Sequence, residues 1–336
     1  MATVSCKTIV RSNKVVASQA PVLGSKPVLR AAAKAPSKAC SFKSLSAFQG
    51  QAMVEKAKRS TVSRRNMEVS AGSVETTTGL GDLPMVKITG DDGSSAEAYL
   101  FGGVVTSWKP AGGDDVLYVR PDAKFDKSKP ISGGLPHCFP QFGPGPIQVH
   151  GFARNVDWEL TGTTDGAEPS VEMTLSPSDY SKAMWDKEFK ATQTITLSEG
   201  KLTATLKVMN TGDEEFDFTA SFHTYFAADI EKVAVSGLDG LKVTDRLAEK
   251  DSTQEGDVAI AGPVDSVYYD SGEMGLETGA AKVTIGSAGW TDAVVWSPWS
   301  DMDCYKEFVC VENAVVGAPA VVPGGGEWSA TTTLSV

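Results

Sequence analysis

Apolar and polar residues alternate along much of the chain after residue 83, as they do in strands that bury one face. Residues 190–197 (KATQTITL) and 201–208 (KLTATLKV) both alternate, and Ser-Glu-Gly joins them, which predicts a β-hairpin. Many short strands separated by frequent turns predict an all-β sandwich, built as one large two-sheet domain. Further alternating or short apolar runs lie between turn residues at 213–222, 282–285, 294–296 and 331–336.

Helical periodicity is scarce, and residues 181–189 (SKAMWDKEF) are the best candidate for a short helix. A Gly- and Thr-rich stretch over 71–83 predicts a linker that leads into a domain over 84–336. Neither an internal repeat of fixed period nor a second linker divides that domain, so we expect it to fold as one unit.

The first 70 residues differ in composition from the rest. Residues 1–54 contain eight Lys or Arg and no Asp or Glu, although the whole chain carries a net charge of −11. A stretch rich in Ala, Ser, Val and Lys that lacks acids is typical of an organellar transit peptide, and the Ser/Ala/Lys/Val bias favours the plastid. The sequence therefore predicts a transit peptide over 1–70 and a location in the chloroplast stroma. A basic tail that stays attached is the alternative.

Composition also bears on partners and cofactors. The acidic domain argues against binding to nucleic acid, because neutralising phosphates needs clustered positive charge. No apolar run approaches the roughly 18 residues of a membrane-spanning helix. The five cysteines contain no C-x-x-C pair, which argues against a disulfide framework and favours a reducing compartment. Metal-ligand spacings, a P-loop and a dinucleotide fingerprint are all missing from the sequence, so we expect no metal and no cofactor.

Two side chains outside the loops are candidates for proton transfer. His223, one of three histidines, ends an alternating run. On a strand it would share a face with Tyr225, either in a polar cleft or as a core histidine satisfied by the backbone. Glu312 stands in the apolar run FVCVEN, where burial would raise its pKa and make it a useful general base. A strand residue that faces solvent is the alternative for Glu312.

The stretch 133–155 contains five glycines and four prolines, too many for an ordinary strand or helix. It includes Gln141 in the segment FPQFGP, and it ends in the segment HGFARN with His150 and Arg154. A loop this constrained either holds polar side chains for a ligand or closes the sandwich as a rigid turn. The segment WSPW at 296–299 places two rings near a turn, where they stack on a sugar or pack into the core.

Together these segments resemble the galactose mutarotase superfamily, and within it the aldose 1-epimerase-like branch of glucose-6-phosphate 1-epimerases. The resemblance covers about residues 84–336, and its motifs occur in the order of the family. It implies a large antiparallel β-supersandwich, in keeping with the alternation. The motifs are GGVVTSW (102–108), GGLP (133–136), FPQFGP (139–144), HGFARN (150–155), FHTYF (222–226), VWSPW (295–299) and VEN (311–313).

The resemblance also implies an isomerase that interconverts the α and β anomers of a hexose 6-phosphate without metal or cofactor. In that reaction Glu312 would take the proton of the anomeric hydroxyl while His223 protonates the ring oxygen, so that the ring opens, rotates and closes again. The implied partner is a small sugar or sugar phosphate, and we expect a monomer. The residues implied to hold the substrate are His150, Arg154, Asp265 and Gln141.

One position departs from the resemblance. Relatives that act on sugar phosphates usually carry Arg before the Gly-Gly of residues 133–134, and Ser132 stands there instead. A phosphate clamp favours guanidinium geometry, so this change weighs against a phosphorylated substrate. The alternative function is a non-catalytic carbohydrate-binding or regulatory protein, because a fold does not fix a function. Basic residues that could replace the missing Arg are Lys124, Lys127, Lys129 and Arg154.

Overall fold

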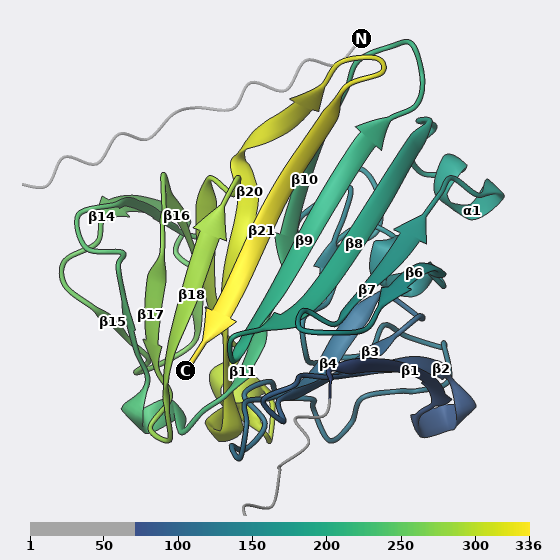
Figure 1. Cartoon of the computed structure of the whole chain (residues 1–336). Coiled ribbons are helices and arrows are strands. Elements are labelled where there is room, and N and C mark those ends of the chain that lie inside the picture. Colours follow the sequence, from purple (N-terminus) through teal and green to yellow (C-terminus); the bar gives the residue numbers. More distant parts are fainter. Residues whose placement is uncertain (1–70) are drawn as a thin grey trace, which may run out of the picture. The chain divides into compact units, whose positions relative to one another are not determined.

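The computed structural model describes residues 71–336, and the predicted transit peptide over 1–70 lies outside the described residues. Within 71–336 the strands form three antiparallel sheets of nine, eight and four strands (Figure 1). The prediction of an all-β, antiparallel β-supersandwich is confirmed. The helical segments are short: α1 (Asp179–Lys182) and the 3-10 turns η1 (Leu80–Asp82), η2 (Ala153–Asn155), η3 (Ile230–Lys232), η4 (Trp299–Asp301) and η5 (Tyr305–Glu307).

The nine-stranded sheet contains the hairpin that the sequence predicts. Leu197 pairs with Leu202, and Glu199 and Gly200 form the two-residue turn with φ values of 51° and 72°. Positive φ at both turn residues matches the right-handed twist of the flanking strands. The strands in order are β15 (Val258–Ala259), β12 (Ala234–Ser236), β17 (Met274–Glu277), β18 (Lys282–Ala288), β21 (Glu327–Ser335), β9 (Lys201–Asn210), β8 (Phe189–Ser198), β7 (Ser170–Leu175) and β6 (Glu159–Thr164).

The eight-stranded sheet passes behind the nine-stranded one in Figure 1 and is organised by one long strand. That strand, β20, pairs with β19 on one side and with both β10 and β11 on the other. It therefore brings residues about ninety positions apart in the chain next to each other. The strands in order are β14 (Lys250–Thr253), β13 (Lys242–Asp245), β16 (Val264–Tyr269), β19 (Asp292–Ser297), β20 (Phe308–Val322), β10 (Phe216–Phe222) and β5 (His137–Cys138), with β11 (Tyr225–Ala227) beside β20.

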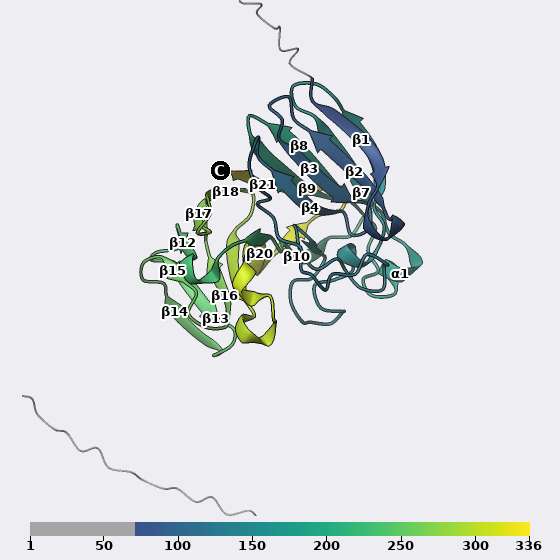
Figure 2. The same cartoon turned by 90° about the horizontal axis from the view of Figure 1, so that it is seen from below.

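The four-stranded sheet corrects the prediction of a linker over 71–83. Residues Ser73–Thr78 form its edge strand β1, which pairs without interruption with β2 from Ser73↔Thr89 to Thr78↔Pro84. The Val and Thr residues of this stretch favour strands, and the edge of β2 offers them unpaired backbone groups. The other strands, seen from below in Figure 2, are β2 (Pro84–Thr89), β3 (Ser95–Tyr99) and β4 (Val104–Lys109).

The helix predicted over 181–189 is displaced and shorter in the structure. It begins after Ser178, whose hydroxyl accepts a hydrogen bond from the amide of Ser181, while the Ser181 hydroxyl accepts one from the amide of Ser178. This capping box fixes the start of α1 at Asp179, two residues before the predicted start. Phe189 instead begins β8, because its ring packs into an aromatic cluster with Trp185.

A single hydrophobic cluster joins the three sheets. Phe218 of β10 meets Trp328 of β21 edge to face, with ring centroids 5.2 Å apart, so the two large sheets pack against each other. Burying each large apolar side chain contributes about 1.5–3 kcal/mol. Fully buried members from the three sheets include Ile88, Trp108, Leu206, Phe222 and Val311.

His137 is a polar exception within this core. Its ring stacks on Trp158 with centroids 4.6 Å apart, and burial lowers its pKa from 6.5 to about 4. The folded protein keeps His137 neutral in this window, whereas the unfolded chain takes up a proton below pH 6.5. Because the unfolded state then binds more protons, stability falls as the pH drops from 6.5 to 4, by about 3 kcal/mol for this residue.

We expect replacement of His137 by Leu to reduce this loss of stability in acid, because the variant no longer has a buried imidazole to keep neutral. Urea denaturation of the full chain between neutral pH and about pH 4 measures the effect. The slope of stability against pH decreases but does not vanish, since the pKa values of His150 and His223 are also lowered. A slope equal to that of the unchanged protein contradicts the prediction.

Candidate active site

A cavity of about 390 Å³ lies where the loop over 142–150 meets the eight-stranded sheet. Its volume falls within the range of small-molecule sites, roughly 300–1,000 Å³. Strands β16, β19 and β20 contribute Asp265, Trp296 and Glu312 to its wall. The other polar and aromatic residues of the lining are Arg120, Ser132, Phe142, His150, Arg154, His223, Tyr225 and Arg246.

Glu312 is a fully buried carboxyl group in the middle of β20. Its Oε2 accepts a hydrogen bond of 2.6 Å from the hydroxyl of Ser221 on β10, whereas Oε1 has no hydrogen-bond partner. Burial raises the pKa of Glu312 to about 8, and the nearby Asp265 adds to the rise. Ser221 and two arginines oppose it, but burial outweighs them because the charged form loses its hydration. A carboxyl group with this pKa can give or take a proton near neutral pH.

His223 lies in the two-residue break between β10 and β11. Its backbone amide donates to the Pro136 carbonyl at 2.9 Å, and its ring stacks on Tyr225 with centroids 5.0 Å apart. The ring atom Nδ1 is 3.3 Å from Oε1 of Glu312. Burial, with a further contribution from His150, holds the pKa of His223 well below its ordinary value. These opposite pKa shifts favour one proton on the pair at neutral pH, held by Glu312.

His150 has a backbone conformation that fixes its ring against the cavity. Its φ is +64°, and the next residue, Gly151, has φ +68° where a Cβ would lie 2.1 Å from the Phe139 carbonyl oxygen. Only glycine fits that position. The Nδ1 of His150 accepts from the amide of Gly143 at 3.1 Å and contacts Sγ of Cys138 at 2.9 Å. Burial lowers the pKa of His150 to about 3, so the ring is neutral and carries its hydrogen on Nε2.

The cavity gathers the arginines of the domain. Residues 71–336 contain three arginines, and all three line the cavity. Arg246 pairs with Asp265 at 3.4 Å. Arg154 donates to the Val149 carbonyl at 3.1 Å, its Nε has no partner, and none of the ion pairs among the described residues involves it. The cavity thus contains one guanidinium group whose charge no carboxylate balances.

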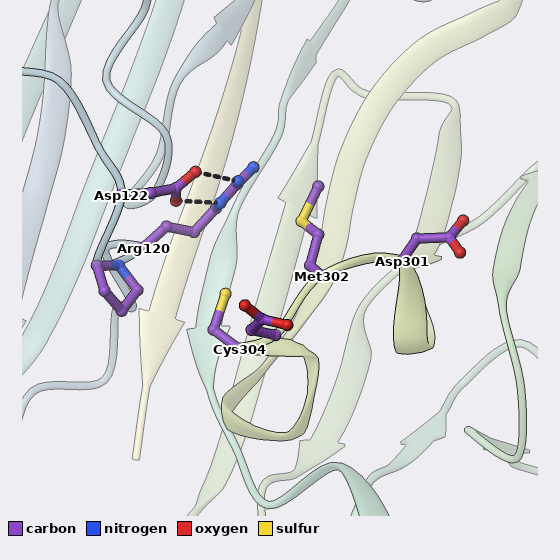
Figure 3. A pocket seen from close by; sticks show the side chains of 7 residues that line it. Arg120, Asp122, Asp301, Met302 and Cys304 are labelled. Carbon is purple, nitrogen blue, oxygen red and sulfur yellow. Dashed lines mark hydrogen bonds and ion pairs between the residues drawn. The ribbon is translucent and has the colours of Figure 1, made fainter.

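Arg120 lines both this cavity and a neighbouring one of about 350 Å³, and Figure 3 shows the residues of the neighbouring one. Its guanidinium group makes two hydrogen bonds to Asp122, of 2.9 and 2.6 Å, which hold the side chain in one orientation. The amide of Arg120 donates to the carbonyl of Ser132 at 3.0 Å, so the two residues face each other on adjacent backbones. Arg120 therefore supplies a guanidinium group beside the position where the sequence has Ser132.

The structure brings five of the six predicted site residues together. The sixth, Gln141, does not line this cavity. Its side-chain amide donates to the Gly143 carbonyl at 3.0 Å, and its Oε1 accepts from the amide of Ile147, so both ends are used inside the loop. The residues brought together are His150, Arg154, His223, Asp265 and Glu312.

The other aromatic and basic residues considered as substrate contacts lie only partly at the cavity. Of the two rings of the WSPW segment, Trp296 lines the cavity, whereas Trp299 packs on Tyr305. Lys127 pairs with Asp157 instead of serving the site, and Lys124 and Lys129 do not line it. Sequence reasoning missed Arg120, Arg246 and Ser221. The scarcity of arginine after residue 70 was the available signal for the first two.

The His, Cys, Asp and Glu side chains of residues 71–336 form no group of three or more that could hold a metal ion. None of the helices in this part of the chain is long and apolar enough to cross a membrane.

Comparisons with known proteins agree with this geometry. The profile of the family described as aldose 1-epimerase matches residues 84–335. The "Putative glucose-6-phosphate 1-epimerase" of Cenchrus ciliaris is 33% identical over 279 residues, covering 75% of this chain and 84% of that protein. The Escherichia coli K12 protein of the same name is 32% identical over 252 residues, covering 69% and 81%. The solved structure of a "putative mutarotase" from Salmonella typhimurium has a TM-score of 0.70 and 26% identity, covering 79% of this chain and 93% of that one.

The contacts of Gln141 generate a prediction about the loop over 143–148. We expect Gln141→Ala to speed backbone hydrogen–deuterium exchange in this loop, because the variant loses donors and an acceptor that hold it, each worth about 1 kcal/mol. Mass spectrometry of the ligand-free protein measures the exchange. Exchange rates that stay unchanged while sugar binding weakens would instead support the direct substrate contact expected from the sequence.

Proposed function

We propose that this chain, which belongs to the aldose 1-epimerase family, interconverts the α and β anomers of a hexose 6-phosphate. One observation carries the proposal: an imidazole nitrogen of His223 and a carboxyl oxygen of Glu312 lie 3.3 Å apart on the wall of a sugar-sized cavity. The family membership gives the class of enzyme, an epimerase. The phosphorylated substrate and the roles of the residues are the parts that we propose.

The reaction needs one base and one acid on the same sugar. Glu312 takes the proton from the anomeric hydroxyl while His223 gives a proton to the ring oxygen, and the C1–O5 bond breaks to leave an open-chain aldehyde. Rotation about the C1–C2 bond and the reverse proton transfers close the ring with the other configuration. The two groups exchange roles in the second half, so no net proton is gained or lost.

The number of protons that Glu312 and His223 hold together fits this scheme. The reactive arrangement has an ionised Glu312 and a protonated His223, which together hold one proton. The resting arrangement also holds one proton, but on Glu312, because burial disfavours both charges. Reaching the reactive arrangement therefore requires only an internal transfer between groups that are 3.3 Å apart. Uptake of a proton from solvent is not needed.

The arginines support a phosphorylated substrate. The domain is acidic overall, yet its three arginines line this one cavity, and Arg154 has no acidic partner among the described residues. Arg120, whose Nε and Nη2 bond to Asp122, has Nη1 left as a donor to a phosphate oxygen on the side of the cavity that Ser132 also lines. We infer that Arg120 replaces the arginine that related sugar-phosphate enzymes carry at the position of Ser132. The Cenchrus ciliaris and Escherichia coli relatives are named for glucose 6-phosphate, which supports this substrate.

The alternative is a protein that binds the sugar without turnover, and the same assay separates the two. Binding of glucose 6-phosphate with no acceleration of anomer exchange would favour it. Import into the chloroplast stroma through residues 1–70 stays a prediction from composition.

Replacement of Glu312 by Gln tests the base. Gln keeps the size of the side chain and can still accept the hydrogen bond from Ser221, but it takes no proton from a hydroxyl. We expect a loss of about 10²–10⁴-fold in kcat/KM, measured as α/β exchange of glucose 6-phosphate by NMR after subtraction of the spontaneous rate. Full activity in this variant contradicts the assigned base.

Exchange of Arg120 and Ser132 tests the phosphate clamp. We expect Arg120→Ser to raise KM for glucose 6-phosphate about tenfold or more while KM for glucose stays the same, because one charge-assisted contact is lost. The double variant Arg120→Ser with Ser132→Arg is the matched control and should recover part of the affinity, since the two positions face each other. Equal effects on the two sugars would show that Arg120 does not read the phosphate.

A further inference from the structure

We propose that Ser221 is a positioning residue that draws the proton shared by Glu312 and His223 away from the carboxyl group. This inference rests on the proposed function and goes beyond it, because Ser221 does not line the cavity and has no place in the resemblance. Its hydroxyl is fully buried on β10 and donates to Oε2 of Glu312 at 2.6 Å.

The hydrogen bond makes the two carboxyl oxygens different. Oε2 is occupied by the Ser221 donor, so a proton on Glu312 belongs on Oε1, the oxygen that lies 3.3 Å from Nδ1 of His223. The donor also favours the ionised carboxylate over the neutral acid, since a charged acceptor makes the stronger bond. Ser221 thus acts in two ways. It leaves the proton on the oxygen nearer His223, and it makes the transfer of that proton to His223 more favourable.

The backbone holds Ser221 firmly in this role. In the sheet Ser221 pairs with Ala314 of β20 on one side and with Cys138 of β5 on the other, two positions from Glu312 along β20. Cys138 in turn contacts the ring of His150. Behind the cavity, the wall is therefore a continuous set of buried polar side chains that runs from His150 to Glu312.

Other ionisable groups also influence the pKa of the same carboxyl group. Asp265 raises the pKa of Glu312, and Arg246 and Arg154 lower it, all less than burial does. Ser221 is the largest of the influences that favour the ionised form. The titratable or charged groups around Glu312 are His223 in the break after β10, Tyr225 on β11, Asp265 on β16, Cys138 on β5, Cys310 on β20, Arg154 on η2 and Arg246 after β13.

The proposal predicts an unusual pH profile for Ser221→Ala. When the pair holds one proton, the affinities of Glu312 and His223 for it set the fraction of enzyme that is reactive, with Glu312 ionised and His223 protonated. Loss of the donor raises the pKa of Glu312 by about one unit, so kcat/KM falls about tenfold at neutral pH. We expect kcat/KM of the unchanged protein to decline above about pH 8, and this decline to move up by the same amount in the variant. At a pH above the pKa of Glu312 in both proteins, Glu312 is ionised in each of them, and we expect the two pH profiles to coincide.

The experiment measures kcat/KM for glucose 6-phosphate against pH in the full chain and in Ser221→Ala. Ser221→Cys, which keeps the volume and has a weaker donor, should give an intermediate shift and replaces Ser221→Ala if that variant does not fold. Thr224→Val is the matched control, because it removes another buried hydroxyl from the same segment, one that donates to the Phe222 carbonyl and not to Glu312. We expect its profile to equal that of the unchanged protein.

A second readout does not depend on turnover. Carbon-13 NMR of labelled glutamate carboxyl groups, with Glu312→Gln to assign the signal, gives the titration midpoint of Glu312 directly. We expect the midpoint to rise in Ser221→Ala. A profile lowered equally at every pH, or an unmoved midpoint, overturns the role of Ser221. Full activity in Glu312→Gln overturns the proposed function instead, so the two failures are distinguishable.

Discussion

Burial of a carboxyl group beside an imidazole is the constraint on which this site depends. Glu312 sits in the central strand of the eight-stranded sheet, where loss of water raises its pKa to about 8, and the same loss of water keeps His223 neutral. An exposed pair would adopt its ordinary charges and hold them, because water stabilises both ions. Burial therefore disfavours both charges, and the hydrogen bond from Ser221 is the largest influence that favours the ionised carboxylate.

The sheet provides that adjustment because β20 pairs with two partners on one side. Strand β10 places Ser221 behind Glu312, and the break after Phe222 turns His223 toward its other oxygen before β11 resumes the pairing. The interruption of the strand is therefore what allows one carboxyl group to be contacted from two sides.

Much of the fold and part of the site could be predicted from the sequence. The alternation at 190–197 and 201–208 predicts β8 and β9 because the buried face of a strand leaves a period of two. The edge strand β1 and the start of α1 could not be predicted in this way. The first depends on a free edge of β2, and the second on a capping box whose two serines are ambiguous in the sequence. The contacts of Gln141 could not be predicted from the sequence either, because both ends of its side-chain amide bond to the backbone of a loop whose conformation the sequence does not specify.

The sequence by itself determined the class of fold, the motifs in their order, and the residue types available for proton transfer, since these are local patterns. Only the tertiary structure decided which of these residues meet. The convergence of His223 with Glu312 follows from strand pairing in the eight-stranded sheet, and the register of that pairing is not written in any local stretch. Arg120 meets Ser132 through a backbone hydrogen bond within the connection between β4 and β5. Pairing between distant segments is decided by packing of the whole core, and that is also what sets the burial, and hence the pKa, of each group.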